Sequence, residues 1–170
     1  MEALAHAEPD WPSRRPRVFN TAFESGMRSL ILLTSCYPTW LGLSRLAALD
    51  YMLVHSGDVE GPPSLHPAED SRAAELFVRR KLVSTGLSLL GTRGLAQRRA
   101  TPHGFRYQAG DEAGSFIDLL KSPYFLDLKT RADWLAANIV SMTDEDFEVL
   151  VRGRIDQWAS EFQEDRTPLV

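Results

Sequence analysis

Residues 94–110 read GLAQRRATPHGFRYQAG, and they predict a β-hairpin in the middle of a chain whose other apolar patterns are helical. Short alternating segments at 95–100 and 105–109 flank Thr101-Pro102-His103-Gly104, which is a turn signal. Gly94 stands where it can end a preceding helix in a left-handed conformation. The fold must therefore combine helices with a small antiparallel β element.

The first of three helices before the hairpin is predicted to begin near Asn20. Thr21 and Glu24 have the spacing of a capping box, and Pro38 ends the helix near Tyr37. The residues that share its apolar face are Phe23, Met27, Leu30, Ile31 and Thr34.

The second and third helices are separated by a long connection. The second is predicted to begin around Leu43 or Ser44 and to stop at Gly57, and Asp70 and Ser71 are good N-caps for the third. The predicted buried faces consist of Leu46, Leu49 and Leu53 in the second helix, and of Ala74, Val78, Leu82, Thr85 and Leu89 in the third.

Three helices followed by a hairpin are the layout of a winged helix-turn-helix. Further helices follow: one starts at Asp111 and Glu112, Pro123 interrupts it, and Thr143 caps the last. A stripe of Leu128, Ala132, Leu135 and Ile139 lies between them. We therefore predict a mainly α fold, organised as a flexible N-terminal arm (1–18), a winged-helix-like domain (19–110), a helical extension packed on it (111–164) and a tail (165–170).

Charge is distributed unevenly along the chain. Residues 72–106 hold eight Lys or Arg and one acid, whereas both flanking regions are acidic. Such a basic middle indicates a nucleic-acid face, an acidic protein partner or a solvated helix face. The candidates for phosphate contact are Arg79, Arg80 and Lys81 on the third helix, and Arg98, Arg99 and Arg106 in the hairpin.

Several classes of protein are disfavoured by the sequence. The longest apolar runs are shorter than a bilayer span, and no secretion signal is recognisable, so we expect a cytoplasmic protein without a membrane segment. The single cysteine, Cys36, excludes an internal disulfide and is predicted to be a small core residue rather than a nucleophile.

The connection between the second and third helices, YMLVHSGDVEGPPSLHP at 51–67, concentrates reactive residue types. His55, Asp58, Glu60 and His66 raise the question of a metal or catalytic site. Their spacing lacks the ligand patterns of zinc sites, no nucleophile signature accompanies them, and no phosphate-binding loop follows. We therefore expect no metal, no cofactor and no catalysis.

A shaped recognition loop is the preferred interpretation of this connection. Gly57 ends a helix, the two prolines stiffen an extended passage, and Pro67 holds His66 extended. An ordered loop of this composition suits protein contact. The predicted partner-binding residues are His55, Asp58, Glu60, Pro62, Pro63, Leu65 and His66.

Motifs along residues 19–158 resemble a known family, the type 2 middle component of bacterial ABC three-component systems. These motifs are Asn20-Thr21-x-Phe23-Glu24-x-Gly26-x-Arg28, Leu30-Ile31-Leu32-Leu33, Asp50-Tyr51-x-Leu53-Val54-His55-Ser56-Gly57-Asp58, Gly61-Pro62-Pro63-Ser64-Leu65-His66-Pro67, Arg79-Arg80-x-Leu82, Gly86-Leu87 and Ser122-Pro123-Tyr124-Phe125. The most specific part is the HSGD…GPPSLHP segment.

The resemblance implies a non-catalytic adaptor. It would couple an SMC/Rad50-like ABC ATPase to an effector-associated subunit in conflict with phage or plasmids, with contact to the DNA backbone also open. Two alternatives remain. One is a winged-helix DNA-binding transcriptional regulator, and the other is a hydrolase that uses His55, Asp58 and His66.

Overall fold

The computed structural model describes residues 21–67 and 72–164, without the side chains of 72–75, 77 and 156–164. The predicted arm at 1–18, the N-caps Asp70 and Ser71, and the tail at 165–170 lie outside the described residues.

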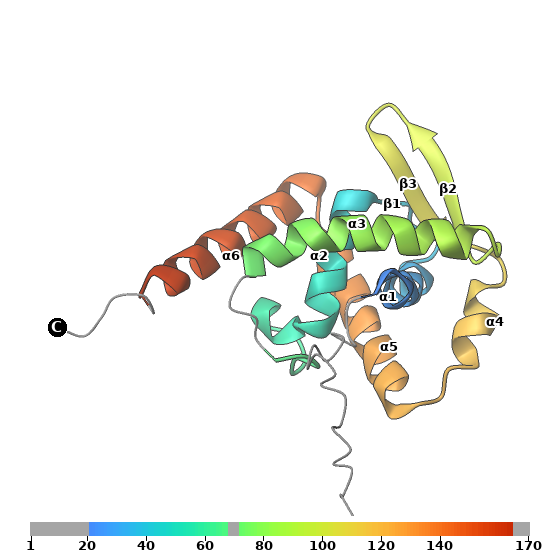
Figure 1. Cartoon of the computed structure of the whole chain (residues 1–170), viewed down its shortest axis with the longest axis horizontal. Helices are drawn as coiled ribbons and strands as arrows, with labels where there is room; N and C mark the ends of the chain where they lie inside the picture. Colours follow the sequence, from blue (N-terminus) through green and yellow to red (C-terminus); the bar gives the residue numbers. More distant parts are fainter. Residues whose placement is uncertain (1–20, 68–71, 165–170) are drawn as a thin grey trace, which may run out of the picture.

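The described chain is mainly helical and includes a three-stranded antiparallel sheet with strand order β1-β3-β2 (Figure 1). The elements in order are α1 (Ala22–Ser35), β1 (Leu41–Gly42), α2 (Leu43–Val54), a short 3-10 helix η1 (Ser56–Val59), α3 (Arg72–Gly91), β2 (Ala96–Thr101), β3 (Gly104–Ala109), α4 (Ala113–Asp118), α5 (Pro123–Leu135), a π-helical segment η2 (Ala136–Val140) and α6 (Asp144–Glu164).

The β-hairpin predicted at 95–109 is confirmed as β2 and β3, with Thr101 opposite Gly104 at the turn. Gly94 has the expected left-handed backbone, with φ of 71°. The sequence did not predict β1, which adds a third strand when Leu41 pairs with Tyr107 and Gly42 with Arg106. A strand of two residues is too short to produce a periodic pattern.

Local capping sets where the helices begin. At α1, the Thr21 hydroxyl accepts a hydrogen bond from the Glu24 N–H at 3.2 Å, and the Glu24 carboxylate accepts one from the Thr21 N–H at 2.9 Å. This is the predicted capping box. Ser122 caps α5, whose first residue is Pro123, and Thr143 accepts from the Asp146 N–H at 3.1 Å to cap α6.

Helices α1 and α3 cross at a pair of glycines in the centre of the molecule. A Cβ added at Gly86 would collide with the Ala22 carbonyl oxygen and come 2.6 Å from the Cα of Gly26. The two backbones approach this closely because neither residue carries a side chain. Figure 1 shows α3 running horizontally, with α1 seen end-on directly below it.

The predicted buried face of α3 is wrong at three of its five residues, and Leu82 is half-buried. Val78 and Leu89 are 60% and 47% exposed, and Thr85 is also exposed, while the Ala74 side chain lies outside the described part. The face that contacts α1 and α2 consists of Arg79, Val83, Gly86, Leu87 and Leu90. An arginine and a glycine interrupt the apolar pattern of this face, so the apolar periodicity predicted that the adjacent face of α3 is buried.

Other predicted stripes are confirmed. Leu46, Leu49 and Leu53 of α2 are fully buried, and the stripe from Leu128 to Ile139 packs into the core along α5 and η2. Phe23 at the start of α1 is an exception, because it is 54% exposed. Helix α5 contacts both α1 and α2, so the C-terminal helices form part of the same core.

Candidate partner-binding loop and basic surface

The connection after α2 folds into a closed loop. The Leu65 and His66 N–H groups both donate to the Val54 carbonyl, at 2.8 and 3.1 Å, so the chain returns to the end of the helix it left. Glu60 adopts a left-handed backbone with φ of 62° at the turning point. The loop therefore begins and ends at the same place on α2.

Hydrogen bonds across the loop hold its outgoing and returning segments together. The Ser56 hydroxyl donates to the Pro62 carbonyl at 2.7 Å, and the Gly61 N–H donates to the Ser56 carbonyl at 2.9 Å. The Gly57 N–H donates to the Ser64 hydroxyl at 3.1 Å. Backbone groups that would otherwise need water are thus satisfied within the loop.

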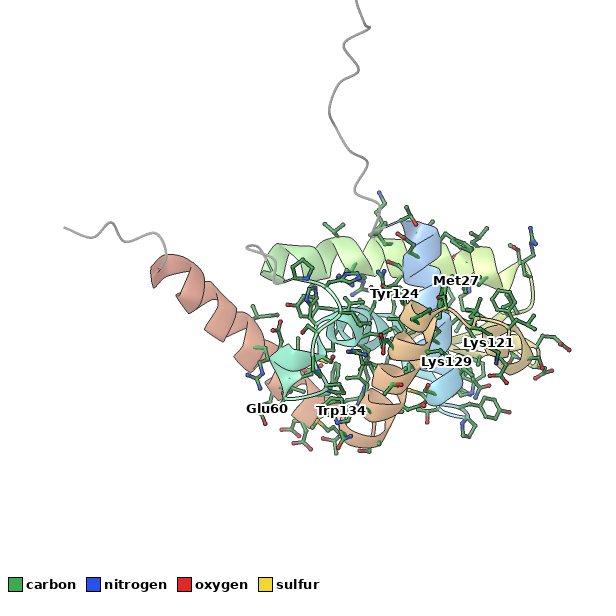
Figure 2. All side chains as sticks on the ribbon, turned by 90° about the horizontal axis from the view of Figure 1, so that it is seen from below. Met27, Glu60, Lys121, Tyr124, Lys129 and Trp134 are labelled. Carbon is green, nitrogen blue, oxygen red and sulfur yellow. The ribbon has the colours of Figure 1, made fainter. Side chains whose placement is uncertain are left out.

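The loop is docked onto α5. Arg131, which is buried, donates two hydrogen bonds to the Pro63 carbonyl, from Nε at 3.0 Å and from Nη2 at 2.6 Å. Gly61 lies so close to Trp134 that an added Cβ would be 2.8 Å from the indole ring. Figure 2 shows Trp134 beside the turn that carries Glu60. These α5 residues fix the loop, and periodicity did not indicate their role.

His66 and Tyr124 make a second link to α5. His66 Nε2 lies 3.0 Å from the Tyr124 hydroxyl, and the two rings are stacked. Burial raises the pKa of Tyr124, against the lowering effect of the nearby Arg28 charge, so its hydroxyl stays protonated at neutral pH.

The prediction that His55 contacts a partner directly is wrong, because this side chain is only 2% exposed. Its ring stacks on Tyr51 with centroids 4.5 Å apart, and Tyr51 in turn donates to the Asp58 carboxylate at 2.6 Å. The motif histidine is therefore an interior residue of the loop. Its role as a core residue follows from the apolar helix that immediately precedes it.

The remaining predicted loop residues differ in exposure. Glu60 and Pro63 are exposed, whereas Asp58, Pro62, Leu65 and His66 are half-buried. Ser64, which was not among the predicted residues, is also exposed. The loop thus offers a narrow outer edge rather than seven contact side chains.

The prediction that Arg79 contacts phosphate is also wrong. This side chain is 1% exposed, and it donates from Nη1 to the Asp50 carboxylate at 2.8 Å and to the Asp50 carbonyl at 3.1 Å. Arg28 from α1 donates to the same carboxylate from Nε at 2.7 Å and from Nη2 at 3.2 Å. One buried aspartate therefore joins α1, α2 and α3 through two arginines.

Burial alone would lower the pKa of Arg28, but the charge and hydrogen bonds of Asp50 outweigh it, so the pKa is raised. Arg28 therefore remains charged in the interior. Arg28, Asp50 and Arg79 all belong to the quoted motifs, and their charges could have indicated a buried cluster.

The other five basic candidates remain predictions. Arg80 and Lys81 are exposed on α3, and Arg80 donates to the Ser44 hydroxyl at 2.7 Å. In the hairpin, Arg98 lies over the Phe105 ring at 4.5 Å, and Arg99 lies over the Trp40 ring at 4.2 Å. Arg106 is directly opposite Arg99 across the strands and donates to the Trp40 carbonyl at 3.2 Å.

Within residues 21–67 and 72–164, no group of three or more His, Cys, Asp or Glu side chains could hold a metal ion. No helix of the described chain is long and apolar enough to cross a membrane. Burial raises the pKa of Cys36 to about 11, which keeps its thiol protonated at neutral pH, as expected for a core cysteine.

Residues 18–161 match the family model of the ABC-three component (ABC-3C) system Middle Component 2. The chain belongs to this family. The match includes the closed loop, the buried arginine cluster and the helices on which the loop rests. A protein of this family is one component of a multi-component system, which implies partner proteins. No curated protein and no solved structure matches the chain.

Proposed function

We propose that this protein is a non-catalytic adaptor that couples an SMC/Rad50-like ABC ATPase to an effector-associated subunit, in the cytoplasm, in a system directed against phage or plasmids. The observation that carries this proposal is the match of residues 18–161 to a middle component family. The match covers nearly the whole chain.

The surroundings of the candidate reactive residues support a role without catalysis. A hydrolase that used His55, Asp58 and His66 would need them to converge on an open site. The rings of His55 and His66 do lie edge to face, 6.0 Å apart, but His55 is only 2% exposed, Asp58 accepts from Tyr51, and His66 contacts Tyr124. Each group is engaged in closing or docking the loop.

The loop's outer edge is a suitable contact surface because it is held in shape before any partner arrives. Arg131 and Trp134 fix it from below, and Glu60, Pro63 and Ser64 are exposed above. Rigid contact surfaces bind with less loss of conformational entropy than mobile ones.

Affinity purification of the tagged chain, co-expressed with its neighbouring genes, tests the proposal. We expect an ABC ATPase and a further subunit to be recovered in fixed ratio after nuclease treatment. A chain recovered alone, or together with other proteins only while DNA is intact, would contradict the adaptor function.

A substitution at the loop edge refines this test. Glu60→Lys should weaken recovery of the partner while the unfolding midpoint stays unchanged, because the Glu60 side chain, 3.4 Å from Arg154, is 89% exposed. Glu112→Lys, an exposed reversal of the same charge before α4, is the matched control. Equal recovery with both variants would remove the loop edge from the contact surface.

A second candidate function is a winged-helix DNA-binding regulator. The succession α1-β1-α2-α3-β2-β3 and the strand order β1-β3-β2 favour a winged-helix arrangement, in which the hairpin would be the wing. Against DNA reading, α2 and α3 are joined by the long connection 55–71 rather than a tight turn, and Arg79 is buried.

DNA binding by the hairpin can be tested with Arg98→Glu combined with Arg99→Glu. A regulator should lose a sequence preference of about a thousandfold or more. An adaptor that only touches the DNA backbone should lose weak, salt-sensitive binding while partner recovery is preserved. Unchanged DNA affinity in the double variant would exclude the hairpin as a DNA contact.

A further inference from the structure

A groove of about 900 Å³ lies between three separate parts of the fold. Its walls come from the hairpin turn at 103–106, from residues 39–45 at β1 and the start of α2, and from the first half of α6. Arg80 of α3 also lines it. Figure 1 shows β1 between the hairpin and α6. It is distinct from the loop at 55–67.

Arg45, which lines the groove, connects two of its walls. This side chain donates to the Asp144 carboxylate at 2.6 Å and to the carbonyls of Ile139, Val140 and Met142 at 2.8–3.3 Å. Its guanidinium also lies 4.4 Å from the centre of the Phe147 ring. Arg45 therefore ties the start of α2 to the start of α6, so the groove is a built surface with fixed walls.

Much of the groove lining is apolar. Trp40, Phe105, Phe147 and Val151 line it from the strand, the hairpin and α6. Phe105 is 50% exposed at the hairpin turn, although a phenyl ring usually finds cover in an isolated protein. Exposed aromatic side chains beside a groove are typical of places where a partner inserts apolar side chains.

The charges around the groove are predominantly positive. Its lining includes four arginines and two acids, namely Arg45, Arg80, Arg106 and Arg152 against Asp144 and Glu148. Asp144 is shared, since Arg106 lies 3.9 Å from it and Arg45 2.6 Å. Arg80 donates to the neutral hydroxyl of Ser44, and Arg152 is exposed. The groove thus has a net attraction for negative charge.

The combination of apolar walls and arginines limits which class of ligand can bind in the groove. A nucleic-acid backbone could pair its phosphates with the arginines, but it would leave the apolar lining unused. An amphipathic protein segment uses both features, because apolar side chains fill the groove and carboxylates pair with the arginines.

We propose that this groove binds an acidic amphipathic segment of a partner subunit in the ABC three-component complex. The inference rests on the proposed adaptor function and adds a second contact surface to it, separate from the loop edge. Apolar insertion would provide affinity, and the arginines would select partners by charge and accelerate their association.

Fluorescence anisotropy tests this inference with the purified chain and short labelled peptides that tile the ABC ATPase and the effector-associated subunit. At least one acidic peptide with an apolar side chain should bind with Kd in the range of about 1–100 μM. An oligoglutamate of equal length should bind far more weakly, because it cannot fill the apolar lining.

Two adjacent residues of α3 provide a matched pair of variants. Arg80→Glu should weaken peptide binding by about tenfold or more. Lys81→Glu changes the net charge equally, but Lys81 does not line the groove, so its effect should stay within about twofold. Phe105→Ala should also weaken binding, and Leu119→Ala, at a side chain that is 76% exposed directly after α4, is its control. Arg80 and Lys81 are both exposed, so neither substitution should disturb the fold.

Other results would overturn the inference. Equal losses with Arg80→Glu and Lys81→Glu, or equal binding of oligoglutamate, would reduce the effect to overall charge. Displacement of the peptide by a DNA duplex whose own binding Arg80→Glu abolishes would assign the groove to nucleic acid. If the full complex assembles equally with wild type and Arg80→Glu and no peptide binds, the groove inference fails while the adaptor function stands. If no complex assembles and no peptide binds, both fail.

Discussion

The two faces of α3 are opposite in what they contain and in what they contact. The inner face includes an arginine and a glycine yet is buried against α1 and α2. The outer face includes Val78 and Leu89 yet is exposed to solvent. Burial on this helix therefore does not follow the apolar content of its faces.

The difference has two physical causes on the inner face. Asp50 compensates the charge of Arg79, so this side chain can be buried. Gly86 allows the backbone of α1 to approach more closely than any side chain would permit. Arg79 and Gly86 therefore interrupt the apolar pattern of α3 at positions where the packing against α1 and α2 requires them.

The largest expected effect comes from the charge cluster on the inner face. Asp50→Asn would remove the buried carboxylate that Arg28 and Arg79 share, so we expect a loss of about 3–5 kcal/mol in the free energy of unfolding. Urea denaturation measures it. Asp111→Asn, at an exposed site, should leave the midpoint unchanged. A small loss in Asp50→Asn would show that the interior of the cluster is accessible to water.

One leucine on each face of α3 allows a direct comparison of the two faces. Leu87→Ala removes a side chain that is 2% exposed and should cost about 2–4 kcal/mol, whereas Leu89→Ala should cost less than about 0.5 kcal/mol. Thermal or urea unfolding of both variants gives the difference. Similar losses would mean that the outer face is covered in the folded protein in solution.

The close helix crossing predicts a smaller effect. Gly86→Ala should destabilise the protein by about 1–3 kcal/mol, because the added methyl group forces α1 and α3 apart. Gly153→Ala in α6, where a Cβ would meet nothing within 4 Å, should instead stabilise by about 0.5–1 kcal/mol. Opposite signs in one denaturation series would confirm the crossing.

The alkylation rate of Cys36 measures how often the folded protein opens, and the measurement needs no substitution at Cys36 itself. Its folded pKa of about 11 is raised by burial, so the protonated thiol favours the folded state at neutral pH. That contribution is complete below the pKa of the unfolded thiol and is lost as pH rises through about 11.

Alkylation by iodoacetamide at neutral pH should therefore be slow in the wild type and in Leu89→Ala, and faster in Asp50→Asn, which opens more often. Equally fast labelling of all three would indicate that Cys36 is accessible without unfolding. The chain has only this cysteine, so mass spectrometry of the intact protein measures the rate.

The candidate surfaces were predictable to different degrees. The loop at 55–67 could be located from its Gly, Pro and Asp content, and its closure by Ser56 and Ser64 agrees with an ordered loop. Which of its side chains face outward was not predictable, since that depends on Arg131 and Trp134, about 70 residues further along the chain. The groove was not predicted at all, because three distant segments form it.

Local sequence determined the features that depend on neighbouring residues. The capping box at Thr21, the hairpin turn at 101–104, the leucine stripe of α2 and the start of α5 at Pro123 all follow from interactions within a few residues, and all are present. The family could also be recognised from the sequence, because its motifs combine residues at specific spacings.

Tertiary structure alone decided which charges are buried and which face solvent. Arg79 and Arg80 are adjacent in sequence and identical in chemistry, yet one bonds to Asp50 in the core and the other lines an open groove. A single helical step of about 100° separates their directions. Their environments differ because α1 and α2 pack on one side of α3 and leave the other accessible.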